Sequence, residues 1–393
     1  MTTGIQADPA SPYRLTFLTT GLMTGGAETM LLKLCSRLDR RRFTPSVLSL
    51  CAEGTLRPRF EALGVPVYDA GMRRGRLSAR GMLTLRRQIL MLRPDLVQGW
   101  MYHGNLAAML LARKLPVVMG IRQSLYQLEN ESLLTRCTIR LGAWLSHYAA
   151  SIVYNSHMSA RQHEAFGFSS ARRLVIPNGF DTESYCPHPG NRQAVRQELR
   201  IHSDMVLIGL IGRYHPMKDH GTFLSAAALL SQRFPMVRFL MAGTSVDATN
   251  NKLVNRIEQL GLSQRVLLLG ERNDMPRVNA ALDIASSTSA WGEGFANAVG
   301  EAMSCGVPCV VTDIGDSAWI VGDTGRVVTP RNAEVIAQAW SELIELGRSG
   351  REELGRQARR RIMDAFALGS VVRRYEELYE KLITRSEVAT CAE

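Results

Sequence analysis

The sequence predicts an α/β protein made of two Rossmann-like domains, each with a parallel sheet. Its 393 residues are enough for two domains of ordinary size. Short apolar strands alternate with amphipathic helices, the pattern of a parallel sheet that is covered on both faces. The alternation starts afresh after a linker marked by Pro187, Pro189 and Gly190. We therefore expect a disordered tail at 1–12, a first domain at 13–185, a second domain at 186–368, and a C-terminal segment at 369–393.

The composition is that of a globular protein, with 46% hydrophobic and 21% charged residues. No apolar run approaches the ~20 residues that are needed to span a bilayer. The N-terminal residues are polar and are not expected to form a signal peptide. The seven cysteines show no metal-ligand spacing. Their odd number and the lack of a signal favour a reducing cytoplasm.

The positive charge of the chain lies in its first half. Residues 1–180 hold 23 Lys and Arg against 10 Asp and Glu, while the remainder holds 24 against 26. Much of the excess falls between Arg73 and Arg87. A basic face attracts anionic lipid headgroups or nucleic acid, although it can also be an ordinary solvated surface. No nucleic-acid recognition motif is present, so we expect a protein that associates with the inner face of the plasma membrane.

The first domain opens as a Rossmann-like unit. A strand over 13–19 leads into a glycine turn at Gly25 and Gly26, and a helix over 29–38 follows. This turn differs from the dinucleotide fingerprint G-x-G-x-x-G, so it does not predict NAD binding. The next elements expected are strands at 43–50, 65–68, 94–100 and 116–121, helices at 56–63, 78–92, 106–114 and 125–147, then a strand from Ser151 and a helix ending at Phe166.

His103 comes just after the strand at 94–100. Ligands of parallel α/β sheets bind at the carboxyl ends of strands. A histidine in a loop at that edge can meet a bound sugar, although a single histidine can equally be an ordinary surface or core residue.

The second domain begins with a helix at 192–199 and a strand at 205–211. The loop after this strand contains Arg213 and Lys218, and a helix at 221–233 follows. Two cations five residues apart can clamp a diphosphate, the arginine as a fork and the lysine as a point charge, or can be surface cations. Further strands are expected at 237–242, 266–269, 283–287 and 309–312, with helices at 250–260, from 275, and at 333–346, 352–366 and 370–384.

The most informative stretch runs from Trp291 to Cys309. Gly292 and Gly294 bracket Glu293 on a loop, and a helix with small residues follows and contains Glu301. A helix N-terminus offers N–H groups and a positive dipole end to an anion. Two carboxylates beside it can accept hydrogen bonds from hydroxyls. The pattern indicates a nucleotide-sugar site, against the alternative of a helix cap with a buried polar contact.

The run E-G-F-x-N-A-x-x-E-A-M-x-C-G-x-P closely resembles the retaining glycosyltransferases of family four, which have the GT-B fold. The resemblance implies two Rossmann-like domains facing a cleft, with the C-terminal helix crossing back to the first domain. It assigns the donor-sugar hydroxyls to Glu293 and the ribose to Glu301. Four more segments resemble the family: Gly25-Gly26-Ala-Glu, Trp-Met-Tyr-His103-Gly-Asn-Leu, Ile-Pro-Asn-Gly-Phe-Asp181, and Gly-Arg213-x-x-x-x-Lys218.

The same resemblance implies the function and the remaining site residues. The expected activity is hexosyl transfer with retention of configuration, from a nucleotide-sugar, usually a UDP-sugar. The catalytic residues expected are Glu293, His103, Arg213 and Lys218. The donor-binding residues expected are Gly25, Gly26, Arg213, Lys218, Arg272, Asn273, Glu293, Gly294, Phe295, Ala296, Asn297 and Glu301. In the family the turn at Arg272 and Asn273 contacts the base through its backbone, and Asn273 replaces the usual aspartate.

The resemblance also implies that no metal or cofactor is needed. Arg213, Lys218 and the helix N-terminus at Phe295 and Ala296 would take up the charge of the leaving diphosphate. No Asp-x-Asp motif is present. The expected acceptor is a saccharide or lipid-linked saccharide of exopolysaccharide, capsule or lipopolysaccharide synthesis. Three alternatives stay open: a nucleotide-sugar epimerase of the same fold, a nucleic-acid-binding protein, and a non-catalytic binding protein.

Overall fold

The computed structural model describes residues 11–73, 78–112, 114–126, 128 and 132–391. Most of the predicted tail, and Arg74 and Arg76 of the basic segment, lie outside these residues. The chain divides into two compact units. One comprises 1–179 with 368–393, and the other comprises 180–367.

The first unit contains a seven-stranded sheet in the order β3-β2-β1-β4-β5-β6-β7, and all neighbouring strands are parallel. The strands are β1 (Tyr13–Thr19), β2 (Phe43–Cys51), β3 (Val67–Met72), β4 (Leu96–Trp100), β5 (Val117–Ile121), β6 (Ser151–Tyr154) and β7 (Arg173–Val175). The inner strands are mostly buried, as expected when helices cover both faces, and the edge strands β3 and β7 are mostly half-buried.

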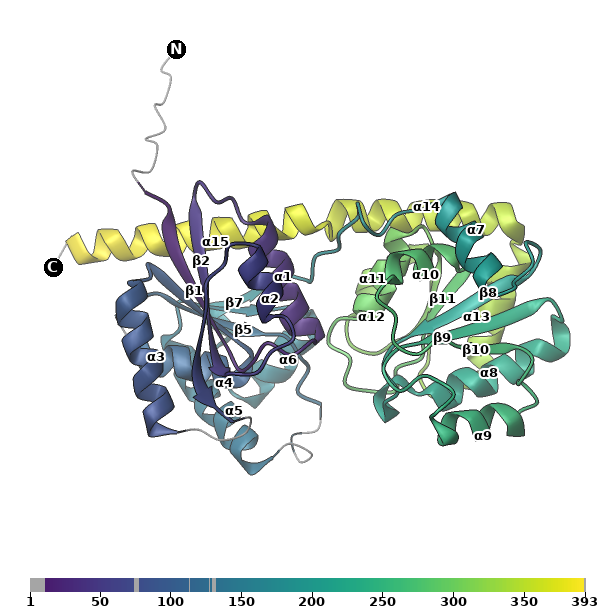
Figure 1. Ribbon diagram of the computed structural model, residues 1–393, viewed down its shortest axis with the longest axis horizontal. Coiled ribbons are helices and arrows are strands. Elements are labelled where there is room, and N and C mark those ends of the chain that lie inside the picture. Colours follow the sequence, from purple (N-terminus) through teal and green to yellow (C-terminus); the bar gives the residue numbers. More distant parts are fainter. Residues whose placement is uncertain (1–10, 74–77, 113, 127, 129–131, 392–393) are drawn as a thin grey trace, which may run out of the picture. The chain divides into compact units, whose positions relative to one another are not determined.

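Helices cover both faces of this sheet. They are α1 (Gly26–Arg37), α2 (Arg57–Ala62), α3 (Ala79–Leu92), α4 (Met101–Leu111), α5 (Leu133–Leu145), α6 (His157–Phe166) and α15 (Leu368–Cys391), with short 3-10 turns η2 (Ser146–Tyr148) and η3 (Ser170–Arg172). One core cluster joins the sheet to α1, α2 and α15, and a second joins its other face to α3, α4, α5 and α6 (Figure 1).

The C-terminal helix α15 packs on the first unit, as predicted. Tyr375 and Tyr379 on this helix are fully buried. The Tyr379 ring lies 6.3 Å from that of Phe17 and 6.1 Å from that of Phe43, between ring centroids. Arg122, at the end of β5, donates a hydrogen bond of 2.8 Å to the Tyr375 hydroxyl. The last segment of the chain therefore completes the core of the first unit.

The second unit contains a six-stranded parallel sheet in the order β10-β9-β8-β11-β12-β13. Its strands are β8 (Val206–Ile211), β9 (Val237–Ala242), β10 (Val266–Leu268), β11 (Ile284–Ser287), β12 (Cys309–Thr312) and β13 (Arg326–Val328). The two parallel sheets confirm the predicted fold class.

The helices of the second unit also divide between the two sheet faces. They are α7 (Pro189–Glu198), α8 (His220–Arg233), α9 (Asn251–Gln259), α10 (Met275–Ala281), α11 (Asn297–Ser304), α12 (Ser317–Val321), α13 (Ala333–Glu345) and α14 (Gly347–Ala365), with 3-10 turns η4 (Pro216–Lys218) and η5 (Gly322–Thr324). One core cluster contains α7, α10, α11, α12 and α14, and the other contains α8, α9 and α13.

Several predicted helix starts are wrong, and one of them is that of α14, which begins at Gly347 instead of 352. Helix α4 begins at Met101 instead of 106, so His103 lies in its first turn and not in a loop. Helix α5 begins at Leu133 instead of 125, because the Ser132 side chain caps it by accepting a hydrogen bond from the Thr135 N–H. Helix α7 begins inside the predicted linker. Pro189 is its first residue, where proline is favoured because its missing N–H is not needed.

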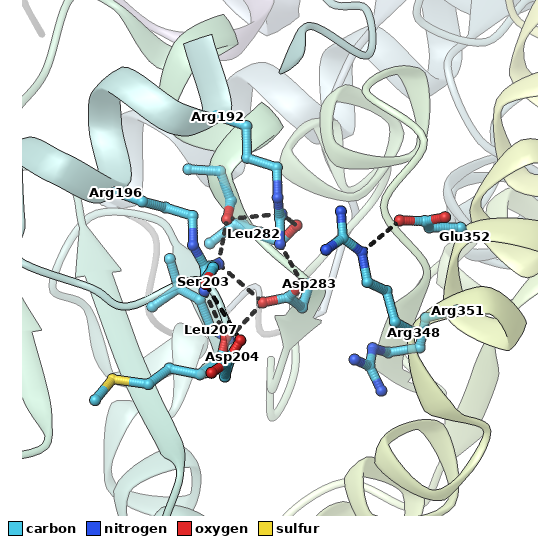
Figure 2. A network of polar contacts seen from close by, with 12 residues as sticks. Arg192, Arg196, Ser203, Asp204, Leu207, Leu282, Asp283, Arg348, Arg351 and Glu352 are labelled. Carbon is cyan, nitrogen blue, oxygen red and sulfur yellow. Dashed lines mark hydrogen bonds and ion pairs between the residues drawn. The ribbon is translucent and has the colours of Figure 1, made fainter. Parts of the chain in front are cut away.

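A buried ionic network holds the amino edge of the second sheet (Figure 2). Asp283 precedes β11 and accepts hydrogen bonds from Arg192 at 2.6 Å, from Arg196 at 3.0 Å, and from the backbone N–H of Leu207 at 2.8 Å. Only 11% of the Asp283 side chain and 6% of the Arg196 side chain are exposed. One carboxylate therefore joins helix α7 to strands β8 and β11.

Replacing Asp283 should destabilise the second unit strongly. The substitution Asp283→Asn leaves Arg196 buried without its counter-charge, and losing one partner of a buried ion pair costs about 3–5 kcal/mol. Asp204→Asn is the matched control, because the Asp204 side chain is 73% exposed. Urea unfolding followed by circular dichroism measures both free energies. Equal stabilities of the two variants would contradict the structural role of Asp283.

Candidate functional site

The candidate site of the second unit lies where its strand order reverses. Strands β8 and β11 are neighbours in the sheet, and the chain leaves them in opposite directions. The loops after these two strands therefore meet at the carboxyl edge, at the place where open α/β sheets bind ligands. Arg213 and Lys218 lie on the first loop, and Glu293 lies on the second. The fold thus brings Arg213 and Lys218 of one loop close to Glu293, which follows Lys218 by 75 positions.

Lys218 and Glu293 form an ion pair between the two loops. The Lys218 Nζ lies 2.6 Å from the Glu293 Oε2, and 19% and 10% of the two side chains are exposed. The Ser289 hydroxyl donates a second hydrogen bond, of 2.9 Å, to the same oxygen. The other oxygen, Oε1, has no hydrogen bond from a residue in the described part of the chain. Glu293 thus keeps one oxygen that could accept from a ligand hydroxyl.

The surroundings of Glu293 keep it ionised. Burial by itself would raise the pKa of its carboxyl. The charge and hydrogen bond of Lys218, the hydrogen bond of Ser289 and the charge of Arg213 outweigh burial and hold the pKa below its usual value. Arg213 is exposed and makes no ion pair with a described residue. The site therefore combines a buried carboxylate with one paired cation and one cation that is free to bind an anion.

Hydrogen bonds between the loops hold Lys218 in place. The Thr288 hydroxyl donates to the Lys218 carbonyl at 2.9 Å, and the Ala290 N–H donates to the Met217 carbonyl at 2.8 Å. Asp219 has a left-handed backbone, with φ of 50°, and caps helix α8 by accepting from the N–H and hydroxyl of Thr222 at 3.1 and 2.7 Å. Lys218 is therefore fixed between a cap and a loop-to-loop contact.

A third loop supports the backbone of Glu293. Gly315, which follows β12, has φ of 62°, a conformation that favours glycine. A Cβ at this position would lie 2.0 Å from the Glu293 carbonyl oxygen, so only glycine fits. The next residue, Asp316, donates its N–H to the Gly294 carbonyl at 3.2 Å. The loops after β8, β11 and β12 together build the site.

Helix α11 starts next to Glu293. Ala296 is its N-cap and provides no side-chain hydrogen bond to the first turn. Phe295 is only 5% exposed and stacks on Phe180, with ring centroids 5.9 Å apart. The Phe295 side chain therefore belongs to the core, and only its backbone is suited to bind a ligand. Asn297, the first helical residue, is half-buried.

Glu301 lies one turn into α11 and is half-buried. Burial and then the charge of Glu301 raise the pKa of Tyr185, whose hydroxyl hydrogen-bonds to the Glu301 carboxylate. Glu301 thus accepts a hydrogen bond from a side-chain hydroxyl. This contact suits the hydroxyl-binding role that was predicted for it.

At the turn of Arg272 and Asn273, the Arg272 side chain is already engaged by carboxylates of the protein. The Arg272 guanidinium forms two hydrogen bonds of 2.8 Å with Asp274 and one of 2.7 Å with Glu198. Asn273 is exposed. Since three of the guanidinium N–H groups are engaged, a base would meet the backbone of this turn and not the Arg272 side chain.

The predicted residues of the first unit gather at its own switch point, between β1 and β4. Gly25 is the N-cap of α1, and Gly26 is its first residue. The flexible end of the Glu28 side chain lies against Gly25, 2.4 Å from where a Cβ would be. The Trp100 Nε1 donates to the Ala27 carbonyl at 2.9 Å, so the end of β4 is tied to the start of α1.

His103 follows in the first turn of α4. Met101 enters the helix with φ of 68°, and a Cβ on Gly104 would lie 2.2 Å from the Leu18 carbonyl oxygen, so the turn packs closely on β1. His103 is half-buried, and its Nε2 has no hydrogen-bond partner in the described part of the chain. Burial lowers the pKa of His103. The imidazole is therefore neutral at pH 7, and its Nε2 is a buried polar atom without a partner among the described residues.

Sequence reasoning missed several residues of the second unit's site. Ser289 and Thr288 contact Glu293 and Lys218, Gly315 supports the loop, and Tyr185 contacts Glu301. The polar run Ser287-Thr-Ser289 directly after a predicted strand was the available signal for the first two. Among the described residues, no group of three or more His, Cys, Asp or Glu side chains is arranged to hold a metal ion. No described helix is both long and apolar enough to cross a membrane.

The ionisation of Glu293 should depend on Lys218. In Lys218→Met the burial of the carboxyl is no longer opposed by the paired cation, so the pKa of Glu293 should rise from below its usual value to above it. Carbon-13 NMR titration of labelled glutamate carboxyls measures both values, and Glu293→Gln identifies the signal. Arg277→Met is a control with a cation outside the site. The same Glu293 pKa with and without Lys218 would contradict the ion pair.

Comparison with known proteins identifies both halves of the chain. The sequence model described as "Glycosyltransferase Family 4" matches residues 24–184, and that described as "Glycosyl transferases group 1" matches residues 206–346. The Escherichia coli UDP-Gal:alpha-D-GlcNAc-diphosphoundecaprenol alpha-1,3-galactosyltransferase is 32% identical over 149 residues, which are 37% of this chain and 38% of that protein. The lipopolysaccharide core mannosyltransferase LpsB of Rhizobium meliloti is 26% identical over 220 residues, which are 53% of this chain and 61% of that protein.

These alignments span between 38% and 61% of the two curated relatives. The fold extends further than the sequence similarity. The crystal structure of Anabaena HepE in complex with UDP has a TM-score of 0.83 at 24% identity, over 94% of this chain and 100% of that one. This likeness confirms the GT-B fold that was predicted. Since family models match both of its domains, the chain belongs to the group 1 glycosyl transferases of family four.

Proposed function

We propose that the protein transfers a hexosyl group from a UDP-sugar to a saccharide or lipid-linked saccharide, with retention of anomeric configuration and without a metal ion. The observation that carries this proposal is the cluster of Glu293, Lys218 and Arg213 beside the N-terminus of α11. It provides a hydroxyl acceptor and a diphosphate-binding surface within one group of loops.

The leaving diphosphate would be bound by Arg213, Lys218 and α11. Arg213 is exposed and has no carboxylate partner among the described residues. Lys218 uses one of its three N–H donors on Glu293 and keeps two for phosphate oxygens. Helix α11 adds the N–H groups of a first turn that has no side-chain cap. These groups would stabilise the negative charge that develops when the bond between the sugar C1 and the phosphate oxygen breaks.

Glu293 would orient the donor sugar. Its Oε2 is held by Lys218 and Ser289, and its Oε1 would accept from a sugar hydroxyl. We assign it no nucleophilic role, because its charge is already engaged by a cation. Glu301 would accept from the ribose in place of its present contact with Tyr185. The backbone turn at Arg272 and Asn273 would meet the base, and the glycines Gly25 and Gly26 would face the diphosphate.

The acceptor would bind on the first unit near His103. The Nε2 of this neutral imidazole is buried and has no hydrogen-bond partner among the described residues, so it would pair with a sugar hydroxyl once the side chain turns toward the acceptor. The acceptor oxygen would form its bond to C1 on the face that the diphosphate leaves, and its proton would pass to the leaving phosphate. The named E. coli relative acts on a saccharide linked to diphosphoundecaprenol. We therefore propose a lipid-linked acceptor, met at the inner face of the membrane in exopolysaccharide, capsule or lipopolysaccharide synthesis.

The proposed activity is tested with purified protein and a panel of UDP-, GDP- and ADP-sugars. We expect a UDP-sugar to release UDP when a saccharide acceptor is added, and the product to keep the anomeric configuration of the donor, as measured by NMR. Turnover should persist in EDTA, because side-chain cations and a helix dipole neutralise the leaving charge. Release of a free epimer, inversion of configuration, or loss of activity in EDTA that magnesium restores would each contradict part of the proposal.

The two glutamates should differ in their effects. Glu293→Gln keeps the shape of the side chain but loses the charge that strengthens a hydrogen bond from a hydroxyl. It should strongly reduce turnover while affinity for free UDP, measured by calorimetry, stays close to that of the wild type. Glu301→Ala should weaken binding of both the UDP-sugar and free UDP by about 1.5–3 kcal/mol, because the ribose belongs to both. The reverse pattern would exchange the two roles.

A further inference from the structure

Three helices on one face of the first unit carry positive charge without negative charge. Helices α3, α4 and α5, which pack on the same side of the sheet, contain no aspartate or glutamate. Their arginines form no ion pair with a residue in the described part of the chain; these are Arg80, Arg86, Arg87, Arg136 and Arg140. The nearest carboxylates in the sequence before α5, Glu129 and Glu131, lie outside the described residues. The surface is suited to an anionic partner.

The same face exposes large apolar side chains. Of the eleven exposed large hydrophobic residues described in the first unit, eight lie on α3, α5 and the adjoining turn η2. They are Leu83, Leu90 and Met91 on α3, Leu133, Leu134, Leu141 and Trp144 on α5, and Tyr148 on η2. Isolated exposed apolar residues are normal, but a group confined to one face marks an interaction site.

Helix α5 arranges these residues as a stripe. Leu133, Leu141, Trp144 and Tyr148 follow one another at helical spacing and are 72%, 40%, 61% and 70% exposed. The opposite side of the helix, with Ile139, is buried against the sheet. The rings of Trp144 and Tyr148 lie 5.6 Å apart, so they form one aromatic surface.

Basic residues border this stripe. Arg136 and Arg140 precede Leu141 and Trp144 by about one turn each, and His147 follows. At 100° per residue these basic positions fall between the buried side of the helix and the apolar stripe. Helices that lie in the plane of a membrane interface combine an apolar face, flanking cations, and aromatic residues at the headgroup level.

We propose that α5 and η2 form the surface by which the first unit binds an anionic lipid bilayer, with α3 adding further cations. This inference rests on the proposed function, because a lipid-linked acceptor is presented at such a surface. A bilayer fits better than a protein partner. The apolar residues form a convex stripe on one helix, and every charged group described on the three helices is a cation.

The test uses the full-length protein and sedimentation with vesicles, in the absence of nucleotide. The wild type should bind vesicles of phosphatidylcholine with phosphatidylglycerol, and binding should fall as salt rises. The double variant Leu141→Ser with Trp144→Ser should reduce the partition coefficient at least about tenfold, because two apolar side chains lose their burial. The matched control is Leu229→Ser with Leu346→Ser. These leucines of the second unit are 42% and 44% exposed, and their replacement should leave binding unchanged.

The charges are tested separately. Arg136→Gln and Arg140→Gln should each weaken binding to anionic vesicles by about fivefold, the effect expected of one cation near a charged membrane surface. Arg373→Gln is the matched control, because Arg373 is an exposed arginine on α15, at the opposite face of the sheet. Quenching of tryptophan fluorescence by brominated lipid should occur in the wild type and be lost in Trp144→Phe.

Equal binding to neutral and anionic vesicles would overturn the proposal, and so would unchanged binding in the Leu141 and Trp144 variant. A concentration-dependent dimer that this variant abolishes would also overturn it, because a second copy of the chain would then be the partner of this surface. Failure of the proposed function is seen in a different experiment. The Leu141 and Trp144 variant should keep its UDP affinity and its turnover with a water-soluble acceptor. If vesicle binding behaves as predicted but no UDP-sugar is turned over, only the proposed function fails.

Discussion

The location of the candidate site depends on the strand order of two parallel sheets. In the second unit the chain builds outwards from β8 to β10 and then returns to place β11 on the other side of β8. Helix α8 consequently packs on one face of the sheet and α11 on the other. The loops after β8 and β11 thus have no crossover helix between them. The first unit repeats this geometry, with α1 and α4 on opposite faces, and places Gly25 and His103 at the corresponding edge.

The ion pair of Lys218 with Glu293 shows how such an edge can hold a charged side chain. A carboxylate that is 10% exposed requires a counter-charge, and the neighbouring loop provides it. The same lysine would serve a diphosphate under the proposed function, so the donor would share a cation with the residue that orients its sugar. Lys218 would thus link the diphosphate end of the donor to the residue that holds its sugar. Because Glu293 is already ionised, it would not have to lose a proton when the donor binds.

The sequence was sufficient to predict the fold and most of its elements. The strands β9 (Val237–Ala242) and β12 (Cys309–Thr312) were predicted with their observed bounds, because a proline lies shortly before each strand and Gly243 or Asp313 directly follows it. The start of α4 could not be predicted, since Trp100 provides no cap and Met101 has a left-handed backbone. The family pattern pointed to Glu293 and Lys218 separately. Their contact could not be predicted, because it joins residues 75 positions apart and depends on the strand order.

The distribution of charge is a further property that sequence counting could only partly locate. The excess of cations was assigned to the first half of the chain, without indicating a face. The structure shows that Arg42 pairs with Glu376 and Glu380 of α15, and that Arg57 pairs with Glu61 and Asp69. Arg42 and Arg57 thus have carboxylate partners, two of which come from the far end of the sequence.

On the opposite face, α3 and α5 carry arginines and have no carboxylates of their own. Exposed ion pairs contribute little to stability, so folding alone does not explain why these two helices lack carboxylates. A fully solvated basic face would also need no Leu133, Trp144 or Tyr148 at its surface. Helix α5 therefore carries arginines without carboxylate partners among the described residues, and it also carries exposed apolar side chains. Together they favour a partner that satisfies both, and a bilayer with anionic headgroups over an apolar interior does so.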